Sequence, residues 1–256
     1  TTFGRSSVRA PGDMREVAIL AYPVVLQTIA ETLMQVIDSA MVGRLGATEF
    51  GAIGFAGIWV WTLFVPFTGT ATGVQVFVSR HDGAGERERC GPWIWQAMWL
   101  LAPAMTSWME IVWLLLPHLV AWIGPSAAMQ SAAIDYADAR LLGGPAVLAN
   151  FVLTSFLRGI GDTRTPLLAS LVGIVVNVAM AWGLIFGHFG MPALGVAGAG
   201  YAMAAGSITI CAGLLVAVLR RSIRVPYHTR PCAPSRPELA RFLRTSAPIG
   251  GQWLLD

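Results

Sequence analysis

Four polar residues in the first apolar stretch of the chain carry side chains that could bind a cation or a proton. Glu31 and Asp38 are carboxylic acids, Gln27 and Gln35 are amides, and Pro23 precedes them. At 100° per residue these positions fall on one side of a helix, and apolar residues occupy the other faces. A charged side chain that faces lipid is costly, so this polar face predicts a cavity or neighbouring helices beside it.

The two acids suggest proton chemistry. Burial disfavours the charged form of a carboxyl group, so Asp38 or Glu31 could take up a proton near neutral pH. Asp38 lies about 22 residues into the stretch, or roughly 33 Å along a helix, which places it in the outer half. Pro23 lacks an N–H and can kink the helix. The alternative for Gln27 and Gln35 is that they join helices through interhelical hydrogen bonds.

Later apolar stretches carry fewer polar groups, namely Glu110, Asn150, Thr154 and Asn177. For Asn177, structural hydrogen bonding and cavity lining both remain open. Asp138 and Arg140 lie two residues apart and therefore diverge on a helix, so we expect each to find a partner on another helix.

These groups need membrane helices to position them. The chain is 55% hydrophobic and 12% charged, whereas a soluble domain has about 25% charged residues. Long apolar runs without strand-like alternation predict an all-α polytopic membrane protein. The expected spans cover residues 16–40, 51–78, 93–117, 128–156, 166–187 and 194–219, with a seventh that begins near 239.

The arginines predict the orientation of these spans, because cytoplasmic loops carry an excess of basic residues. All 17 basic residues are Arg. One side holds Arg5, Arg9, Arg15, Arg80, Arg87, Arg89, Arg158, Arg164, Arg220, Arg221, Arg224, Arg230, Arg236, Arg241 and Arg244. Arg44 lies on the other side and Arg140 within a span. We expect six spans, a cytoplasmic amino terminus and, since no single basic face forms, no nucleic-acid partner.

The sequence gives no indication of metal binding or catalysis. Cys90, Cys211 and Cys232 lack metal-ligand spacing and are interpreted as small space-filling residues. No HExxH, GxSxG or P-loop pattern occurs, so we expect no enzyme, no catalytic residue, no metal and no bound cofactor.

The segment 220–238 is rich in Arg and Pro and predicts a linker. After it, residues 240–256 align without gaps with residues 15–31 and repeat the Pro and Gln of Pro23 and Gln27. Internal repeats are common in secondary transporters. We therefore expect a six-helix lobe at 1–225, a cytoplasmic linker at 226–238 and the first helix of a second lobe at 239–256, with the rest of that lobe missing from this sequence.

Four stretches together resemble one family. They are "VIDSAMVGRLGA" (36–47), "SRHDGAGERER" (79–89), "FLRGIGDTRTPL" (156–167) and "GVAGAGYA" (195–202). They resemble the multidrug and toxic compound extrusion (MATE) transporters, in the DinF-like bacterial branch. The resemblance implies two six-helix lobes, twelve helices in all, in the bacterial inner membrane. It also implies antiport of organic, often cationic or amphipathic substrates against H⁺ or Na⁺.

The resemblance also implies roles for residues of this chain. Asp38 matches the family aspartate that couples transport to the ion, Pro23 the hinge proline, and Asn177 an asparagine of the fifth span. Ala181 stands where many members have an aspartate, and Met203 where a threonine is common. Glu31 is our own candidate for a second acid. A Na⁺ site needs several oxygen ligands, so the absence of an aspartate at Ala181 favours H⁺ as the coupling ion. We expect Gln27, Gln35, Asn150, Thr154 and Tyr201 to line the cavity.

Two other functions remain as alternatives. A lipid-linked saccharide flippase of the related superfamily would carry more basic charge in its cavity. "GIGD" (159–162) matches the GxGD pattern of intramembrane aspartyl proteases. Asp162 lies between two arginines at a span end, however, and Asp favours helix starts, so the stronger prediction is that it caps the following span or pairs with one of these arginines.

Overall fold

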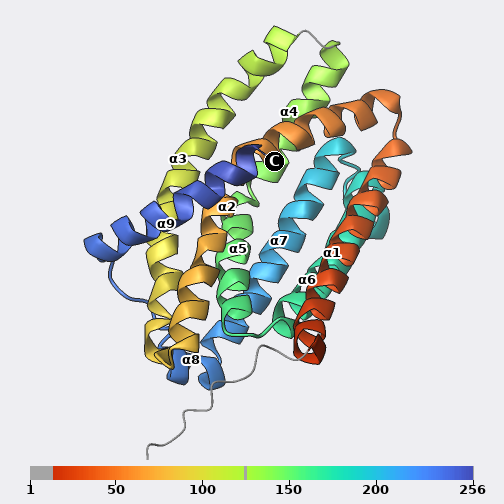
Figure 1. The fold of residues 1–256 in the computed structure, drawn as a ribbon. Helices are drawn as coiled ribbons and strands as arrows, with labels where there is room; N and C mark the ends of the chain where they lie inside the picture. The colour runs from red at the N-terminus through yellow and green to blue at the C-terminus, as the bar shows by residue number, and fades with distance from the viewer. Residues whose placement is uncertain (1–13, 124–125, 256) are drawn as a thin grey trace, which may run out of the picture.

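The computed structural model describes residues 14–123 and 126–255, and every element in these ranges is helical (Figure 1). Arg5, Arg9 and Asp256, which entered the sequence predictions, lie outside the described residues. The helices are α1 (Met14–Gly43), α2 (Ala47–Gly83), η1 (Arg87–Arg89), α3 (Pro92–Ile123), α4 (Ala127–Leu141), α5 (Gly144–Gly159), α6 (Arg164–Phe186), η2 (His188–Gly190), α7 (Val196–Leu219), α8 (Arg221–Tyr227) and α9 (Arg236–Leu255).

Most of the helices are long. Their sequences are largely apolar, and a helix needs about 20 apolar residues to cross a bilayer. Within the described ranges, four stretches are long and apolar enough to cross a membrane: α2, most of α3, α6 and α7. The bent pair α4 and α5 passes the same test as a fifth. Helix α1 is not among them, and it is the helix that carries the polar face of Gln27, Glu31, Gln35 and Asp38.

The single span expected at 128–156 is wrong in one respect. Two helices occupy this region, α4 and α5, and they meet at an angle of 48°. Pro145 explains the break, because it lacks an N–H and its ring clashes with the carbonyl four residues earlier, at Leu141. Gly143 and Gly144 lower the cost of the turn.

Two apolar clusters hold the bundle together. The larger one joins α2, α3, α5 and α7, with Phe64, Met105, Phe156 and Leu214 almost fully buried. The smaller one includes Val42 near the end of α1 and Tyr136 of α4. Ala181 is also buried in this second cluster. The end of α1 that bears Asp38 is therefore packed against apolar side chains of other helices.

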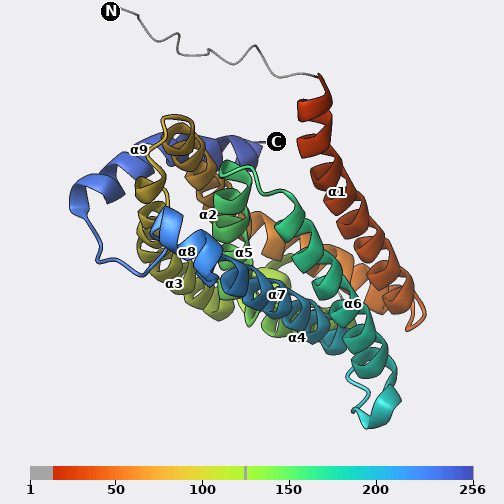
Figure 2. The same ribbon diagram turned by 90° about the horizontal axis from the view of Figure 1, so that it is seen from below.

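Helices α6 and α7 approach each other closely (Figures 1 and 2). Small residues permit this approach, because in lipid helices associate through tight packing. Gly206 of α7 faces Gly173 and Asn177 of α6 without a side chain between them. The same helix faces α4 through Gly200.

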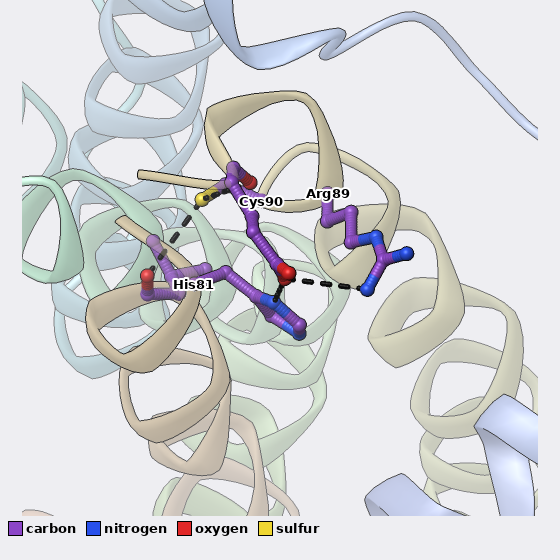
Figure 3. A network of polar contacts seen from close by, with 5 residues as sticks. His81, Arg89 and Cys90 are labelled. Carbon is purple, nitrogen blue, oxygen red and sulfur yellow. Dashed lines mark hydrogen bonds and ion pairs between the residues drawn. The ribbon is translucent and has the colours of Figure 1, made fainter. Parts of the chain in front are cut away.

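A compact loop joins α2 to α3 and contains a small polar network (Figure 3). His81 Nδ1 and Arg89 Nη1 lie 2.9 and 3.3 Å from Oε2 of Glu86. Its hydrogen bond with His81 and the charge of Arg89 lower the pKa of Glu86, which keeps this carboxylate ionised. Cys90 next to it is fully buried, and its Sγ lies 3.7 Å from the carbonyl oxygen of Val78. A buried thiol agrees with a space-filling role.

The predicted linker is held against α3. The indole nitrogen of Trp95 donates a hydrogen bond of 3.0 Å to the carbonyl of Thr229. The indole nitrogen of Trp99 donates one of 2.9 Å to the carbonyl of Cys232. These bonds satisfy backbone groups of a segment that has no regular structure of its own between α8 and α9.

Gln96 completes this attachment. Its Nε2 donates to the carbonyl of Ala233 at 3.1 Å, and its Oε1 accepts from the amide of Ser235 at 3.0 Å. Only 1% of Gln96 is exposed, so both ends of a buried amide are used to fix the linker. Helix α9 follows and packs along α2 and α3 (Figure 1).

Replacing Gln96 with Ala should loosen the linker. The substitution removes both hydrogen bonds, so the amide hydrogens of residues 228–235 should exchange about tenfold faster. Hydrogen–deuterium exchange with mass spectrometry measures this directly. The exposed Gln75 of α2 provides the control, and Gln75→Ala should leave the linker unchanged. Equal exchange in the Gln96 variant and the unaltered protein would show that the linker is held by other contacts.

Candidate functional site

The polar face of α1 does not lie in one environment. Pro23 and Gln27 are buried, Asp38 is partly buried, and Glu31 and Gln35 are exposed in this chain. Helix α1 packs mainly against α6 (Figure 2). The polar face of α1 therefore divides into two parts. The inner group, nearer the start of the helix, lies around Gln27, and Asp38 lies farther along, near the end of the helix.

The inner group is a hydrogen-bonded cluster of four residues. Gln27 Nε2 donates to Ser170 Oγ at 2.9 Å and to Glu31 Oε1 at 3.0 Å. Arg158 Nη2 donates to Gln27 Oε1 at 2.9 Å. Ser170 Oγ lies 3.5 Å from Glu31 Oε1. The cluster joins α1 to the end of α5 and the first turns of α6.

Sequence reasoning missed two members of this cluster. Arg158 was counted only as a cytoplasmic charge, and Ser170 was not singled out. A signal existed for Arg158, since it begins the "RGIGDTRTP" stretch on which the resemblance rests. Nothing in the sequence pattern marks Ser170, because a serine in a membrane helix usually bonds to its own backbone.

Asp38 stands apart from that cluster. Within the described part of the chain, neither carboxylate oxygen of Asp38 has a hydrogen-bond partner, although both are buried. Besides its burial, the charge of Arg140 acts on this carboxylate. A buried anion without donors is expensive, and the neutral acid is much less so. The arrangement suits a group that exchanges a proton.

Arg140 is itself held in place. Its Nη1 donates to the hydroxyl of Tyr136 at 2.6 Å, and that hydroxyl lies 3.2 Å from Sδ of Met203 in α7. The expectation that Arg140 would bond to another helix is thus wrong for its hydrogen bond, because Tyr136 lies one turn earlier on the same helix. Gly57 of α2 leaves space beside both groups.

Asn177 is 1% exposed and sits where α6 meets Gly206 of α7. Neither its Nδ2 nor its Oδ1 has a partner among the described residues. Asn150 donates from Nδ2 to the carbonyl of Ser207 at 3.0 Å, while its Oδ1 is also without a partner there. Both asparagines therefore keep unused hydrogen-bonding capacity inside the bundle.

The remaining predicted residues are not brought into these groups by any contact described above. Thr154 is partly buried and Tyr201 is 41% exposed. Within residues 14–123 and 126–255, no group of three or more His, Cys, Asp or Glu residues could hold a metal ion. A shallow pocket between α2, α3 and α4 is lined by apolar side chains such as Phe55, Trp59 and Leu116, and it offers no ion ligands.

Of the two roles predicted for Asp162, the structure shows the capping role. Its Oδ1 accepts from the amide of Thr165 at 3.0 Å, and its Oδ2 accepts from the hydroxyl of the same residue at 2.6 Å. Both oxygens of the GxGD aspartate are thereby engaged at the first turn of α6. This arrangement gives no support to an aspartyl protease, which needs two aspartates that share a proton.

The comparison with known families now decides the class. A family model described as MatE matches residues 23–183, more than half of the chain. The chain belongs to the MatE family. The multidrug resistance protein PmpM of Pseudomonas aeruginosa is 29% identical over 253 residues, which cover 95% of this chain and 51% of that protein. MdtK of Klebsiella pneumoniae strain 342 is 30% identical over 236 residues, covering 91% and 50%.

Solved structures agree on the fold. An outward-facing multidrug resistance MATE family transporter of the MOP superfamily superposes with a TM-score of 0.83 at 22% identity, over 93% of this chain and 52% of that one. An inward-facing structure gives 0.75 at 23% identity, over 91% and 54%. The predicted all-helical membrane lobe is confirmed, and the chain spans about half the length of the curated relatives it matches. Membership of this transporter family also confirms that the chain is not an enzyme.

Gly206 offers a test of the packing that encloses Asn177. A Cβ there would lie 3.0 Å from Asn177 Cβ and 3.1 Å from the carbonyl oxygen of Gly173. We expect Gly206→Ala to destabilise the lobe by about 1–3 kcal/mol, because both neighbours belong to a packed helix. Thermal unfolding in detergent measures the loss.

Gly213→Ala is the matched control on the same helix. Its Cβ would meet only Ala169 Cβ, at an ordinary 3.6 Å. Its melting temperature should be unchanged or slightly raised, since Ala favours a helix over Gly. Equal melting temperatures for both variants would contradict the tight contact at Gly206.

Proposed function

We propose that this chain forms the amino-terminal lobe of a secondary antiporter of the DinF-like branch. The antiporter exports organic, often cationic or amphipathic compounds in exchange for H⁺. It lies in the bacterial inner membrane, with the amino terminus in the cytoplasm and a second lobe that completes the cleft. Family membership and the names of the relatives, which are multidrug resistance proteins, support this proposal.

The observation that best supports the proposal is the burial of the Asp38 carboxylate without a hydrogen-bond partner in the part of the chain that the structure describes. This carboxylate is buried where α1 meets other helices of the bundle, and it lacks a donor among the described residues. Ionisable residues inside a membrane are costly and usually functional. A carboxyl group that alternates between a protonated buried state and an ionised state open to water would link proton uptake to the conformation of α1.

The surroundings of Asp38 favour H⁺ over Na⁺. Ala181, at the position of a second family aspartate, is buried and apolar. Arg140 places positive charge near Asp38, which opposes the binding of a metal cation. Glu31 is engaged by Gln27 and Ser170 in the inner cluster, so we assign it no share in a common ion site with Asp38.

The other predicted residues take supporting roles in this proposal. Pro23 supplies the hinge of α1. The amide of Asn177 and the Oδ1 of Asn150, which lack partners among the described residues, are offered to a substrate or to water inside the lobe. Gln35, Thr154 and Tyr201 line the face that the second lobe closes.

The experiment that tests the proposal is proton-driven efflux by the full-length protein, with both proposed lobes, in proteoliposomes. With ethidium as substrate and no Na⁺, an imposed pH gradient should drive export. Asp38→Asn should reduce this export by about a hundredfold or more, because the amide cannot exchange a proton. The exposed Asp135 of α4 gives the control, and Asp135→Asn should retain export.

Three results would contradict the proposal. Unchanged proton-driven export in Asp38→Asn would remove Asp38 from the coupling mechanism. Export that requires Na⁺ and ignores the pH gradient would refute the choice of ion. Transport of a lipid-linked saccharide in place of ethidium would favour the flippase alternative.

A further inference from the structure

The inner cluster lies between the two functional positions of α1. Along the helix, Pro23 comes first, Gln27 follows one turn later, and Asp38 lies about 16 Å beyond Gln27. Gln27 is bonded to Arg158 of α5 and Ser170 of α6, as described above. The outer part of α1 is therefore attached to two other helices just after its hinge.

Proline makes the hinge position specific. Pro23 has no N–H, so the backbone ladder of α1 is weakest over the turn that precedes it. Gln27 and Asp38 both lie on the outer side of this weak point and belong to one uninterrupted helical segment. A swing of that segment about Pro23 moves Gln27 together with Asp38.

The amide of Gln27 is held in one orientation. Its Oε1 accepts from Arg158, so its Nε2 must face Ser170 and Glu31. Only 7% of Gln27 is exposed, and breaking these bonds would leave a buried amide unpaired. The bond to Arg158 is charge-assisted and is the strongest contact between this amide and another helix.

We propose that Arg158 is a positioning residue that holds the outer segment of α1 against α5 and α6 through Gln27. The segment can swing about Pro23 only when the bond between Arg158 and Gln27 opens. Arg158 thereby sets the balance between the held and the released positions of α1. The proposal rests on the proposed function only in that α1 carries the coupling residue, and its test needs no transport.

The test is a distance measurement between two spin labels in the full-length protein. Cys90, Cys211 and Cys232 are first replaced, and labels are attached through Val36→Cys on α1 and Val175→Cys on α6, both exposed positions. With the native Arg158, we expect one dominant distance. In Arg158→Gln the population of a second distance should rise about tenfold. The loss of a hydrogen bond to a charged group typically shifts a two-state equilibrium by about this factor.

Four further variants separate positioning from general damage. Gln27→Met keeps the shape of the side chain but loses the bonds, so it should reproduce the effect of Arg158→Gln. The double variant should be no more disturbed than either single one, because both remove the same contact. Arg158→Lys should restore the native distance in part, because Gln27 accepts a single N–H of Arg158. Arg164, an exposed arginine at the start of α6, gives the control, and Arg164→Gln should have no effect.

The proposal is overturned if Arg158→Gln leaves the distance distribution unchanged, or if Arg164→Gln changes it equally. Additive effects of Arg158→Gln and Gln27→Met would also overturn it. If Arg158→Gln yields no folded protein, Gln27→Met carries the same test. Because the distances are measured without substrate or gradient, this result is independent of whether Asp38 couples transport to H⁺.

Discussion

The absence of water inside a bilayer is the constraint on which this structure depends. Lipid offers no hydrogen-bond partner, so each polar group of α1 must be satisfied by protein or remain a cost. Gln27 meets this requirement through Arg158 and Ser170, which fixes α1 against two neighbouring helices. Asp38 does not meet it within the described residues, and the same helix therefore combines a satisfied anchor with an unsatisfied acid.

Close packing makes this combination possible. Glycines on α7 bring its backbone against α6 and α4, which encloses Asn177 and supports Tyr136 beside Arg140. The smaller apolar cluster contacts one side of the end of α1, and the carboxylate oxygens of Asp38 are buried there without polar ligands among the described residues. A site of this kind can bind a proton, whereas it offers few of the oxygens that a metal cation needs.

Much of this arrangement is predictable from the sequence, because lipid imposes long apolar helices and a single polar face on α1. The capping role of Asp162 follows equally well from its position at a helix start. The break at Gly143 is not predicted by the apolar composition, because the apolar run continues across it. Pro145 is the residue that marks its place. Ser170 and the bond from Arg140 to Tyr136 depend on side-chain contacts, and no sequence spacing determines those.

We propose that Asp38 exchanges a proton when the full-length protein changes its conformation. The most direct measurement is proton release from the purified full-length protein on addition of tetraphenylphosphonium, followed with a pH indicator in weak buffer. The account predicts release of about one proton per bound cation, because binding and protonation are linked through the same helix. It predicts no release from Asp38→Asn. Equal release from both proteins would contradict it, because the proton would then come from another group.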